Sequence, residues 1–269
     1  MVPQDFASKV TVTLIGTATA IINIDGVNFL TDPAFDPANI EYDTGILVLK
    51  KSDDVALKLE DLPPIDAILL SHEDHYDNLD TLGRTLLNGR HILTTMDGAK
   101  NLAPRPGVRG LQPWESVPLE LAGKSFKITA TPCQHFPGGE CIGFVIESPS
   151  FGTSESGLPN VVFFSGDTVY TTELSEGLRQ RFHVKLAIMN LGAAIVPVPG
   201  KEPMLITMDG KEGAQLVREI GAELMAPMHF DSWGHFTEHG DALRRVLAAD
   251  PEIDARVRWL SPGVPQHLL

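Results

Sequence analysis

The sequence predicts an α/β (α+β) fold, because strand-like and helix-like segments alternate along one chain. Residues 10–31 have the alternation of a β-meander, and Asp25-Gly26 is a strong signal for a hairpin turn within it. Later runs, such as residues 65–70, are short and continuously apolar, as is typical of strands buried on both faces. Residues 209–221 have the spacing of an amphipathic helix.

The other elements follow from the same patterns. Asp209 is a good N-cap for the helix at 209–221, and Gly221 is a good C-terminal stop. Helical spacing is also expected at residues 79–87, 97–103 and 239–249. Strands are expected at residues 10–16, 20–24, 27–30, 65–70, 92–95, 117–121, 125–131, 141–147, 161–164, 186–190 and 224–228, and near 257–260.

Composition and charge restrict the class of protein. The chain has 269 residues, of which 43% are hydrophobic and 21% are charged, an ordinary composition for a globular protein. Its 21 Lys and Arg residues against 35 Asp and Glu residues give a formal net charge of −14. So acidic a chain argues against nucleic acid as a partner, because phosphates need neutralising Lys and Arg side chains. The length allows one large domain or two small ones.

The cysteines and the N-terminal residues indicate the compartment. Cys133 and Cys141 have neither CxxC spacing nor the spacing of a zinc knuckle, and no disulfide framework is indicated. The first residues lack the basic and apolar regions of a signal peptide, and no apolar run approaches the roughly 20 residues that span a bilayer. We therefore expect a cytoplasmic protein without a membrane partner.

Polar residues recur where the expected buried strands end. His72, Asp167, Asn190 and His229 each follow an apolar run. Loops that leave strands at one edge of a sheet lie close together, so side chains from distant parts of the sequence can meet there. A metal site requires such an arrangement.

The densest group of candidate ligands is His72-x-x-His75-x-Asp77-Asn78. Histidine and aspartate are the ligands of Zn²⁺, Mn²⁺ or Fe in hydrolytic centres. The alternative is a polar loop in which Asp77 or Asn78 caps a helix.

Other single residues extend this group. His135 lies in an expected turn and is either a ligand or a surface residue, and Asp167 can bridge two cations or cap a helix. His229 follows a buried run in the same way. Beyond it, Trp233, His235 and Phe236 either line a pocket or form a loop over an aromatic core pair.

The order of the motifs is more specific than any one of them. The segments are Ile15-Gly16-Thr17-Ala18-Thr19, Phe29-Leu30-Thr31-Asp32-Pro33, Ser71-His72-Glu73-Asp74-His75-Tyr76-Asp77-Asn78-Leu79-Asp80, Thr131-Pro132 to His135, Ser165-Gly166-Asp167-Thr168, Pro227-Met228-His229 and Trp233-Gly234-His235-Phe236-Thr237-Glu238. This order resembles the metallo-β-lactamase superfamily, in the subgroup that includes L-ascorbate-6-phosphate lactonase and N-acyl-phosphatidylethanolamine phospholipase D. The resemblance covers roughly residues 10–262. It implies a single hydrolase domain at residues 1–269 with the four-layer αββα sandwich fold and metals at the open edge between two sheets.

The first loop departs from the family's pattern. The family has one residue between its first two histidines, whereas two residues separate His72 from His75, so Asp74 is a rival to His75 as a ligand. The family's last histidine is Asn78 here, and an amide is a poorer ligand for a transition metal than imidazole. Thr17 also stands where some relatives carry a histidine.

The resemblance implies two metal sites. Their ligands would be His72, His75 and His135 in the first site and Asp77 and His229 in the second, with Asp167 bridging. Because Asn78 replaces a histidine, we expect a weak second site, so that the chain binds one or two ions of Zn²⁺ or Mn²⁺. Asp32 is expected to orient a ligand histidine from behind.

The implied chemistry is the hydrolysis of a small-molecule lactone, ester or cyclic amide by metal-bound hydroxide. Asp77 would hold the attacking water and accept its proton, and His235 would donate a hydrogen bond to the substrate or protonate the leaving group. The runner-up is a phosphodiesterase, with Lys201 and Lys211 as candidate phosphate ligands, and a metal-binding protein with a degenerate catalytic site is a third reading. The expected partner is a small-molecule substrate, and a homo-oligomer is compatible with the sequence, which does not indicate the oligomeric state.

Overall fold

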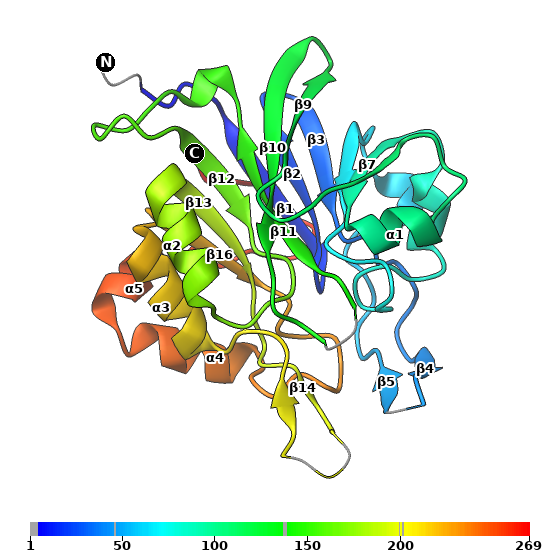
Figure 1. Cartoon of the computed structure of the whole chain (residues 1–269). Helices are drawn as coiled ribbons and strands as arrows, with labels where there is room; N and C mark the ends of the chain where they lie inside the picture. Colours follow the sequence, from blue (N-terminus) through cyan, green and yellow to red (C-terminus); the bar gives the residue numbers. More distant parts are fainter. Residues whose placement is uncertain (1–4, 46, 137–138, 199, 201) are drawn as a thin grey trace.

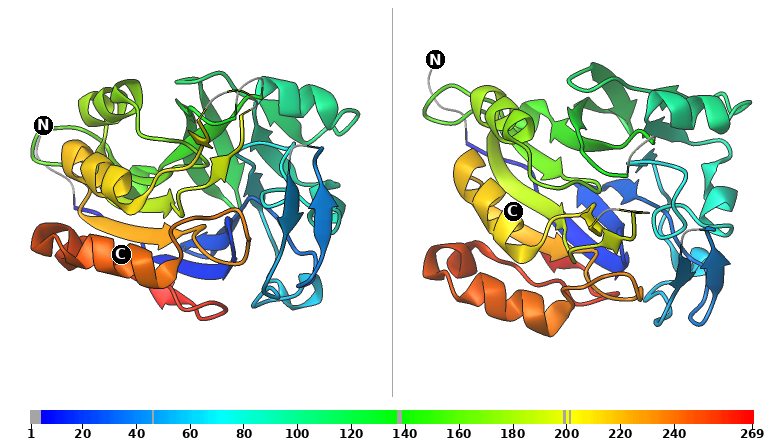
Figure 2. Two further views of the ribbon diagram at one scale, coloured as in Figure 1. Left: turned by 90° about the horizontal axis from the view of Figure 1, so that it is seen from below. Right: turned by 60° about the horizontal axis from the view of Figure 1, so that its bottom comes forward.

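Two β-sheets packed face to face, with helices outside them, form the structure (Figures 1 and 2). It is a computed structural model, which describes residues 5–45, 47–136, 139–198, 200 and 202–269. Helices α2 to α5 cover the outer face of one sheet, and α1 lies beside the other. The layers run helix, sheet, sheet and helix, which confirms the expected αββα sandwich.

The first sheet contains seven strands in the order β17-β1-β2-β3-β6-β7-β8. Its first half is the predicted meander, in which β1, β2 and β3 pair antiparallel. From β3 onward the pairing is parallel, so β3, β6 and β7 all end at one edge of the sheet. The strands are β1 (Val10–Gly16), β2 (Thr19–Ile24), β3 (Val27–Thr31), β6 (Ala67–Leu69), β7 (His91–Thr94), β8 (Val108–Gly110) and β17 (Gln266–His267).

The second sheet contains six strands in the order β16-β13-β12-β11-β10-β9. Strands β12, β13 and β16 are parallel neighbours, and β10 has the same direction because β11 is antiparallel to both β10 and β12. Their carboxyl ends therefore share one edge. The strands are β9 (Ser116–Leu121), β10 (Lys124–Pro132), β11 (Ile142–Glu147), β12 (Asn160–Phe164), β13 (His183–Asn190) and β16 (Leu224–Met228).

The helices end where the sequence supplies caps. In α3 the Asp209 side chain accepts a hydrogen bond from the amide of Glu212, and Gly221 adopts a left-handed conformation with φ 66° at the C-terminus, as predicted. The helices are α1 (Met96–Asn101), α2 (Thr172–Arg181), α3 (Gly210–Ile220), α4 (Gly240–Ala248) and α5 (Pro251–Arg256), with 3₁₀ turns η1 (Leu59–Asp61), η2 (Gly83–Leu87) and η3 (Pro149–Phe151).

Apolar side chains fill the space between the layers. Between the sheets, the rings of Phe29 and Phe126 meet edge to face with centroids 5.1 Å apart. A second cluster joins the outer face of the second sheet to the helices, and a third covers the outer face of the first sheet. Since both faces of the central strands are covered, their sequences are continuously apolar.

Two short ribbons stand apart from the sheets near the edge where the parallel strands end (Figures 1 and 2). One pairs β4 (Glu41–Asp43) with β5 (Val48–Lys50), and the other pairs β14 (Ile195–Val196) with β15 (Met204–Leu205). Both matter for the site described below.

Two predicted elements were wrong, and two helices were missed. Residues 79–87 contain only η2 in place of the predicted α-helix, although the Asp80 carboxylate accepts a hydrogen bond from the amide of Gly83. The strand near 257–260 is reduced to an isolated bridge between Val257 and Met225. Helices α2 and α5 were not predicted. Among the residues that the structure describes, no helix combines the length and apolar character needed to cross a membrane.

Candidate metal centre

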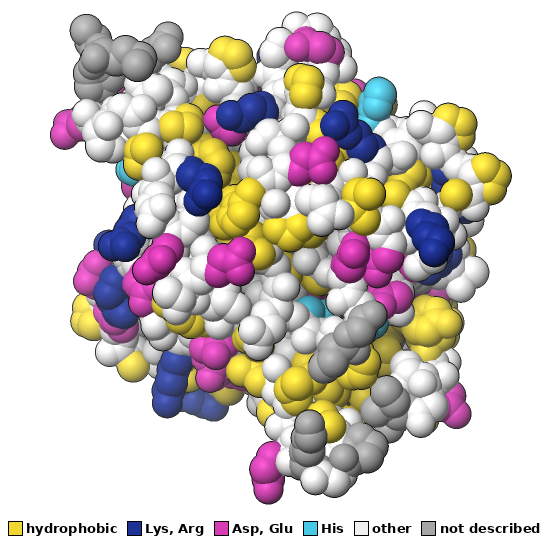
Figure 3. Space-filling model, in the orientation of Figure 1, with side chains coloured by type: hydrophobic (Ala, Val, Ile, Leu, Met, Phe, Trp, Pro, Cys, Tyr) yellow, Lys and Arg dark blue, Asp and Glu magenta, His cyan; other side chains and the backbone are white. Residues whose placement is uncertain are grey.

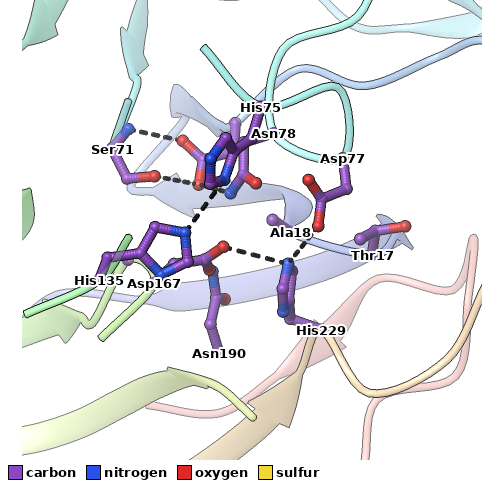
Figure 4. A network of polar contacts seen from close by, with 12 residues as sticks. Thr17, Ala18, Ser71, His75, Asp77, Asn78, His135, Asp167, Asn190 and His229 are labelled. Atoms are coloured by element: carbon purple, nitrogen blue, oxygen red, sulfur yellow. Dashed lines mark hydrogen bonds and ion pairs between the residues drawn. The ribbon is translucent and has the colours of Figure 1, made fainter. Parts of the chain in front are cut away.

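Four of the predicted ligands lie at strand ends that meet at one edge of the sandwich. His72 follows β6 of the first sheet, whereas His135, Asp167 and His229 follow β10, β12 and β16 of the second. Figure 4 shows the side chains of His135, Asp167 and His229 pointing toward one another at this edge. The predicted convergence of strand-end loops is therefore what the structure shows.

The first group of side chains is made of histidines. A ring nitrogen from each of His72, His75 and His135 lies within 4.8 Å of the others. Nδ1 of His75 is 3.0 Å from Nε2 of His135. Asp74, the rival to His75 in the sequence, is exposed and lies outside this group. The extra residue in the loop is thus accommodated with the His75 ring turned inward.

A hydrogen-bond chain from Asp32 orients the ring of His72. The Ser71 hydroxyl donates to Oδ2 of Asp32 at 2.7 Å, and it lies 2.8 Å from Nδ1 of His72. With its one hydrogen used, the hydroxyl accepts from the protonated Nδ1, which leaves a lone pair on Nε2. This Nε2 is buried without a hydrogen-bond partner among the described residues. Burial lowers the pKa of His72 well below its usual value, so the ring is neutral at pH 7.

Hydrogen bonds also fix the side chains of Asp32 and His135. Burial raises the pKa of Asp32 to about 7 although Ser71 and Asn78 donate hydrogen bonds to it. Nδ1 of His135 donates to the carbonyl of Ile206 at 2.6 Å, so its Nε2, which lies 3.0 Å from Nδ1 of His75, carries the lone pair. Burial lowers the pKa of His135 to about 4. His72 and His135 are therefore neutral imidazoles, the form that binds metals.

The second group contains two carboxylates and one histidine. Nε2 of His229 lies 3.4 Å from Oδ2 of Asp77 and 3.4 Å from Oδ2 of Asp167. The amide of Asn190 donates to the other oxygen of Asp167 at 2.7 Å, which fixes that carboxylate. All three members are buried. Two buried carboxylates in one group require a compensating positive charge, which a bound cation would supply.

The pKa values in this group reflect its charges. Burial disfavours the charged form of His229, but the carboxylates of Asp167 and Asp77 outweigh burial and raise its pKa to about 9. Burial also opposes ionisation of Asp77, yet hydrogen bonds from His229 and His235 lower its pKa well below the usual value. The protonated ring of His229 therefore supplies the positive charge between the two carboxylates.

The backbone at the site is unusual. His229, Asp32 and Thr17 have positive φ values of 63°, 29° and 51°, and the amide of His229 donates to the carbonyl of Thr17 at 3.0 Å. Gly166 also has a positive φ, and a Cβ there would lie 2.6 Å from the carbonyl oxygen of Ile142. Strained conformations of this kind concentrate at functional sites.

The remaining predicted residues surround these groups. Asn78 donates to Asp32 at 3.0 Å, and its own buried Oδ1 has no partner among the described residues. Nε2 of His235 lies 3.2 Å from Oδ2 of Asp77. Trp233 and Phe236 are buried and do not contribute to the lining of the cavity beside the site. They instead form part of the apolar cluster behind it.

A cavity of about 220 Å³ opens beside both groups. The ribbons supply most of its apolar wall, and Figure 3 shows histidine side chains near hydrophobic ones on this part of the surface. The residues that line the cavity are Thr44, Leu47, Leu49, Asp74, His75, Asp77, Phe136, Val196, Ile206 and His235. The sequence analysis did not assign Ser71 or the leucines of the β4–β5 ribbon to the site. Only the position of Ser71, directly before His72, could have indicated its role.

The side chains fit a metal better than any other group. The unpartnered buried Nε2 of His72 is consistent with a bound metal, because an unsatisfied buried polar atom costs about 1–3 kcal/mol. Three imidazoles beside two carboxylates and a fourth imidazole are the donor types of zinc and related ions.

Comparison with known proteins supports this reading. The family model described as "Beta-lactamase superfamily domain" matches residues 27–230. A "UPF0173 metal-dependent hydrolase" from Solibacter usitatus is 30% identical over 213 residues, which cover 75% of this chain and 81% of the relative. An uncharacterized protein of Mycobacterium tuberculosis is 28% identical over 266 residues, which cover 91% of this chain.

A solved structure has the same fold. The isothiocyanate hydrolase from Delia radicum gut bacteria superposes with a TM-score of 0.76 at 19% identity, covering 95% of this chain and 98% of that one. The chain spans 66% of the length of the mycobacterial relative.

Proposed function

The chain belongs to the β-lactamase superfamily domain family, within the metallo-β-lactamase superfamily, and from that premise we propose that it is a metal-dependent hydrolase of a small-molecule lactone, ester or cyclic amide. The observation that carries the proposal is that two groups of candidate ligands lie beside one apolar cavity. One group contains three histidines, and the other contains two aspartates and one histidine. A hydrolytic centre needs both a place for metal ions and a dry place for the substrate next to them.

The two groups divide the ligands between two ions. His72, His75 and His135 would hold the first ion, and Asp77 and His229 the second, with Asp167 between them. These residues would hold zinc or manganese, which would supply Lewis-acid chemistry: a lower pKa for water, from about 15.7 toward about 7, and polarisation of the attacked carbonyl. The amide of Asn78 bonds to Asp32 where the family has a ligand histidine, so the second site has fewer ligands and binds its ion more weakly.

Asp77 and His235 are the candidates for proton transfer. The Asp77 carboxylate faces the cavity and would orient the attacking water and accept its proton. His235 lines the same cavity with Nε2 3.2 Å from Asp77, so it can donate a hydrogen bond to the substrate or a proton to the leaving group. Asp32 acts behind the site by holding Ser71, and through it the ring of His72.

The lining favours a carbonyl substrate over a phosphodiester. A phosphodiesterase would benefit from Lys or Arg near the metals, but the described residues of the cavity lining include neither. Lys211 lies on α3, in a separate surface groove. Lys201 lies outside the described residues. A phosphodiesterase and a metal-binding protein with little turnover are therefore alternatives that the experiment must separate.

The test is metal analysis combined with a substrate panel. Protein loaded with zinc or manganese is assayed on neutral lactones, esters and cyclic amides, and on phosphodiesters of similar size. We expect turnover of at least one carbonyl class, and a loss of about 100-fold or more in His72→Ala, which removes a ligand. His183→Ala, which alters a partly exposed histidine of β13, is the matched control.

The alternatives give different results in the same panel. Turnover of phosphodiesters alone would identify a phosphodiesterase. Stoichiometric metal without turnover of any class would identify a binding protein, and either result would overturn the proposal.

A further inference from the structure

The charges around the cavity bear on which substrates can enter, and this inference rests on the proposed hydrolase function. Beyond the proposed ligand His75 and the proton-transfer residues, the lining has one charged side chain, the exposed carboxylate of Asp74. Its neighbours in the lining include Leu47, Leu49 and Phe136. A carboxylate facing an apolar cavity acts on charge over a longer range than in bulk water.

Three described cations close in sequence to lining residues are engaged elsewhere. Lys50 pairs with Glu41 at 2.9 Å across the β4–β5 ribbon. Lys51 is buried and donates to the carbonyl of Asp36 at 2.5 Å. Arg84 donates to the carbonyl of Glu73 at 2.6 Å and pairs with its carboxylate. Among the described residues, these three cations therefore pair with groups other than Asp74.

Asp74 lies beside Gly139. A Cβ added at Gly139 would lie 2.9 Å from Oδ2 of Asp74, so the carboxylate packs against that glycine. Asp74 lines the same cavity as His75 but lies outside both ligand groups. Asp74 is thus free to act on the substrate rather than on a metal.

We infer that this site takes compact apolar substrates that are neutral or positively charged, and that Asp74 is a specificity-determining residue that discriminates against anionic ones. The five aliphatic and aromatic side chains of the lining favour an apolar acyl or ring group through burial. Repulsion by Asp74 makes the binding free energy less favourable for any substrate whose distal end is a carboxylate, sulfate or phosphate.

The test uses three phenyl esters of equal acyl length whose far ends are a methyl group, a trimethylammonium group and a carboxylate. The decisive readout is how Asp74→Asn changes kcat/KM for each ester in the metal-loaded protein. We expect a rise of about threefold to tenfold for the anionic ester, a fall of similar size for the cationic ester and little change for the neutral one. Asp241→Asn, at an exposed aspartate of α4, is the control and should change none of them.

Binding is measured in parallel with methyl ketones that carry the same three ends and cannot be hydrolysed. Calorimetry should give the same order of changes in Kd for Asp74→Asn as the kinetics. Equal effects of Asp74→Asn on all three charge classes in binding would overturn the inference, whether or not the esters turn over. Absence of metal-dependent turnover of every substrate in the panel, with the charge effect on binding intact, would count against the proposed function alone.

Discussion

Asp32 accepts two hydrogen bonds from Ser71, one from the backbone N–H at 2.6 Å and one from the hydroxyl at 2.7 Å. Asp32 follows β3 and Ser71 follows β6, so this pair joins two parallel strands at the edge where the site lies. The Ser71 hydroxyl also contacts Nδ1 of His72 at 2.8 Å. The orientation of one candidate ligand therefore depends on a carboxylate outside both ligand groups.

Ser71→Ala should weaken the first metal site while the fold persists. Without the hydroxyl, Nδ1 of His72 loses its acceptor and the ring its fixed orientation, so zinc affinity should fall by about tenfold or more. A competition titration with a chelating dye measures the affinity, and circular dichroism checks the fold. Ser156→Ala, at an exposed turn residue, should leave the affinity unchanged. Equal affinities in the two variants would show that the chain from Asp32 has no effect on the ligand.

Binding of the second ion should release a proton, whereas binding of the first should not. The pKa of about 9 keeps His229 protonated at pH 7, and a metal must displace that proton. The pKa values of His72 and His135 lie below the usual value, so these ligands are already neutral. Affinity for the second ion should therefore rise by up to about tenfold per pH unit from pH 7 and level off near pH 9.

Calorimetry in two buffers with different ionisation enthalpies measures this proton release for each ion. The expected values are about one proton for the weaker site and close to none for the tighter one. Release of a proton on filling the tighter site alone would reverse the assignment of the two groups.

The β4–β5 ribbon should affect substrate binding more than chemistry. Leu47 lines the cavity, whereas its neighbour Val48 is 56% exposed and points away from it. Leu47→Ala removes apolar contact with bound substrate, so KM for the best neutral substrate should rise about fourfold with kcat nearly unchanged. Val48→Ala should behave like the unaltered protein. Similar KM values in both variants would mean that the ribbon does not contact substrate.

His235 should contribute to turnover without holding a metal. If it donates a proton or a hydrogen bond to the substrate, His235→Gln should lower kcat by about 100-fold or more. The metal content, measured by mass spectrometry of the loaded protein, should stay the same. His239→Gln, at a histidine whose side chain is 55% exposed, is the control. Loss of one ion from the His235 variant would identify this residue as a ligand instead.

The sequence was sufficient for most strands and for the strand-end positions of several candidate ligands because both depend on local patterns, whereas the αββα fold and the grouping of the ligands were implied by the family resemblance. Buried strands are continuously apolar, and each ends in a polar residue that can be seen without a structure, such as Asp167 after β12. The two groups that the structure brings together are the ones implied by the family resemblance. Their role as ligands remains a prediction.

Other features depend on contacts that no local pattern reveals. Whether Asp74 or His75 joins the candidate ligands depends on how the loop after β6 folds, and the spacing in the sequence left both alternatives open. The cavity wall comes from residues such as Leu49 and Val196 in two separate ribbons whose side chains meet only in three dimensions. Trp233 and Phe236 were expected in the pocket, but large aromatic rings also fill cores, and here they do so.

The most direct test of the central claim is the activity and metal content of one preparation before and after chelation. The account predicts one or two bound ions, loss of turnover to background when they are removed, and recovery when zinc or manganese is added back. Unchanged turnover of a carbonyl substrate by protein shown to contain no metal would contradict it.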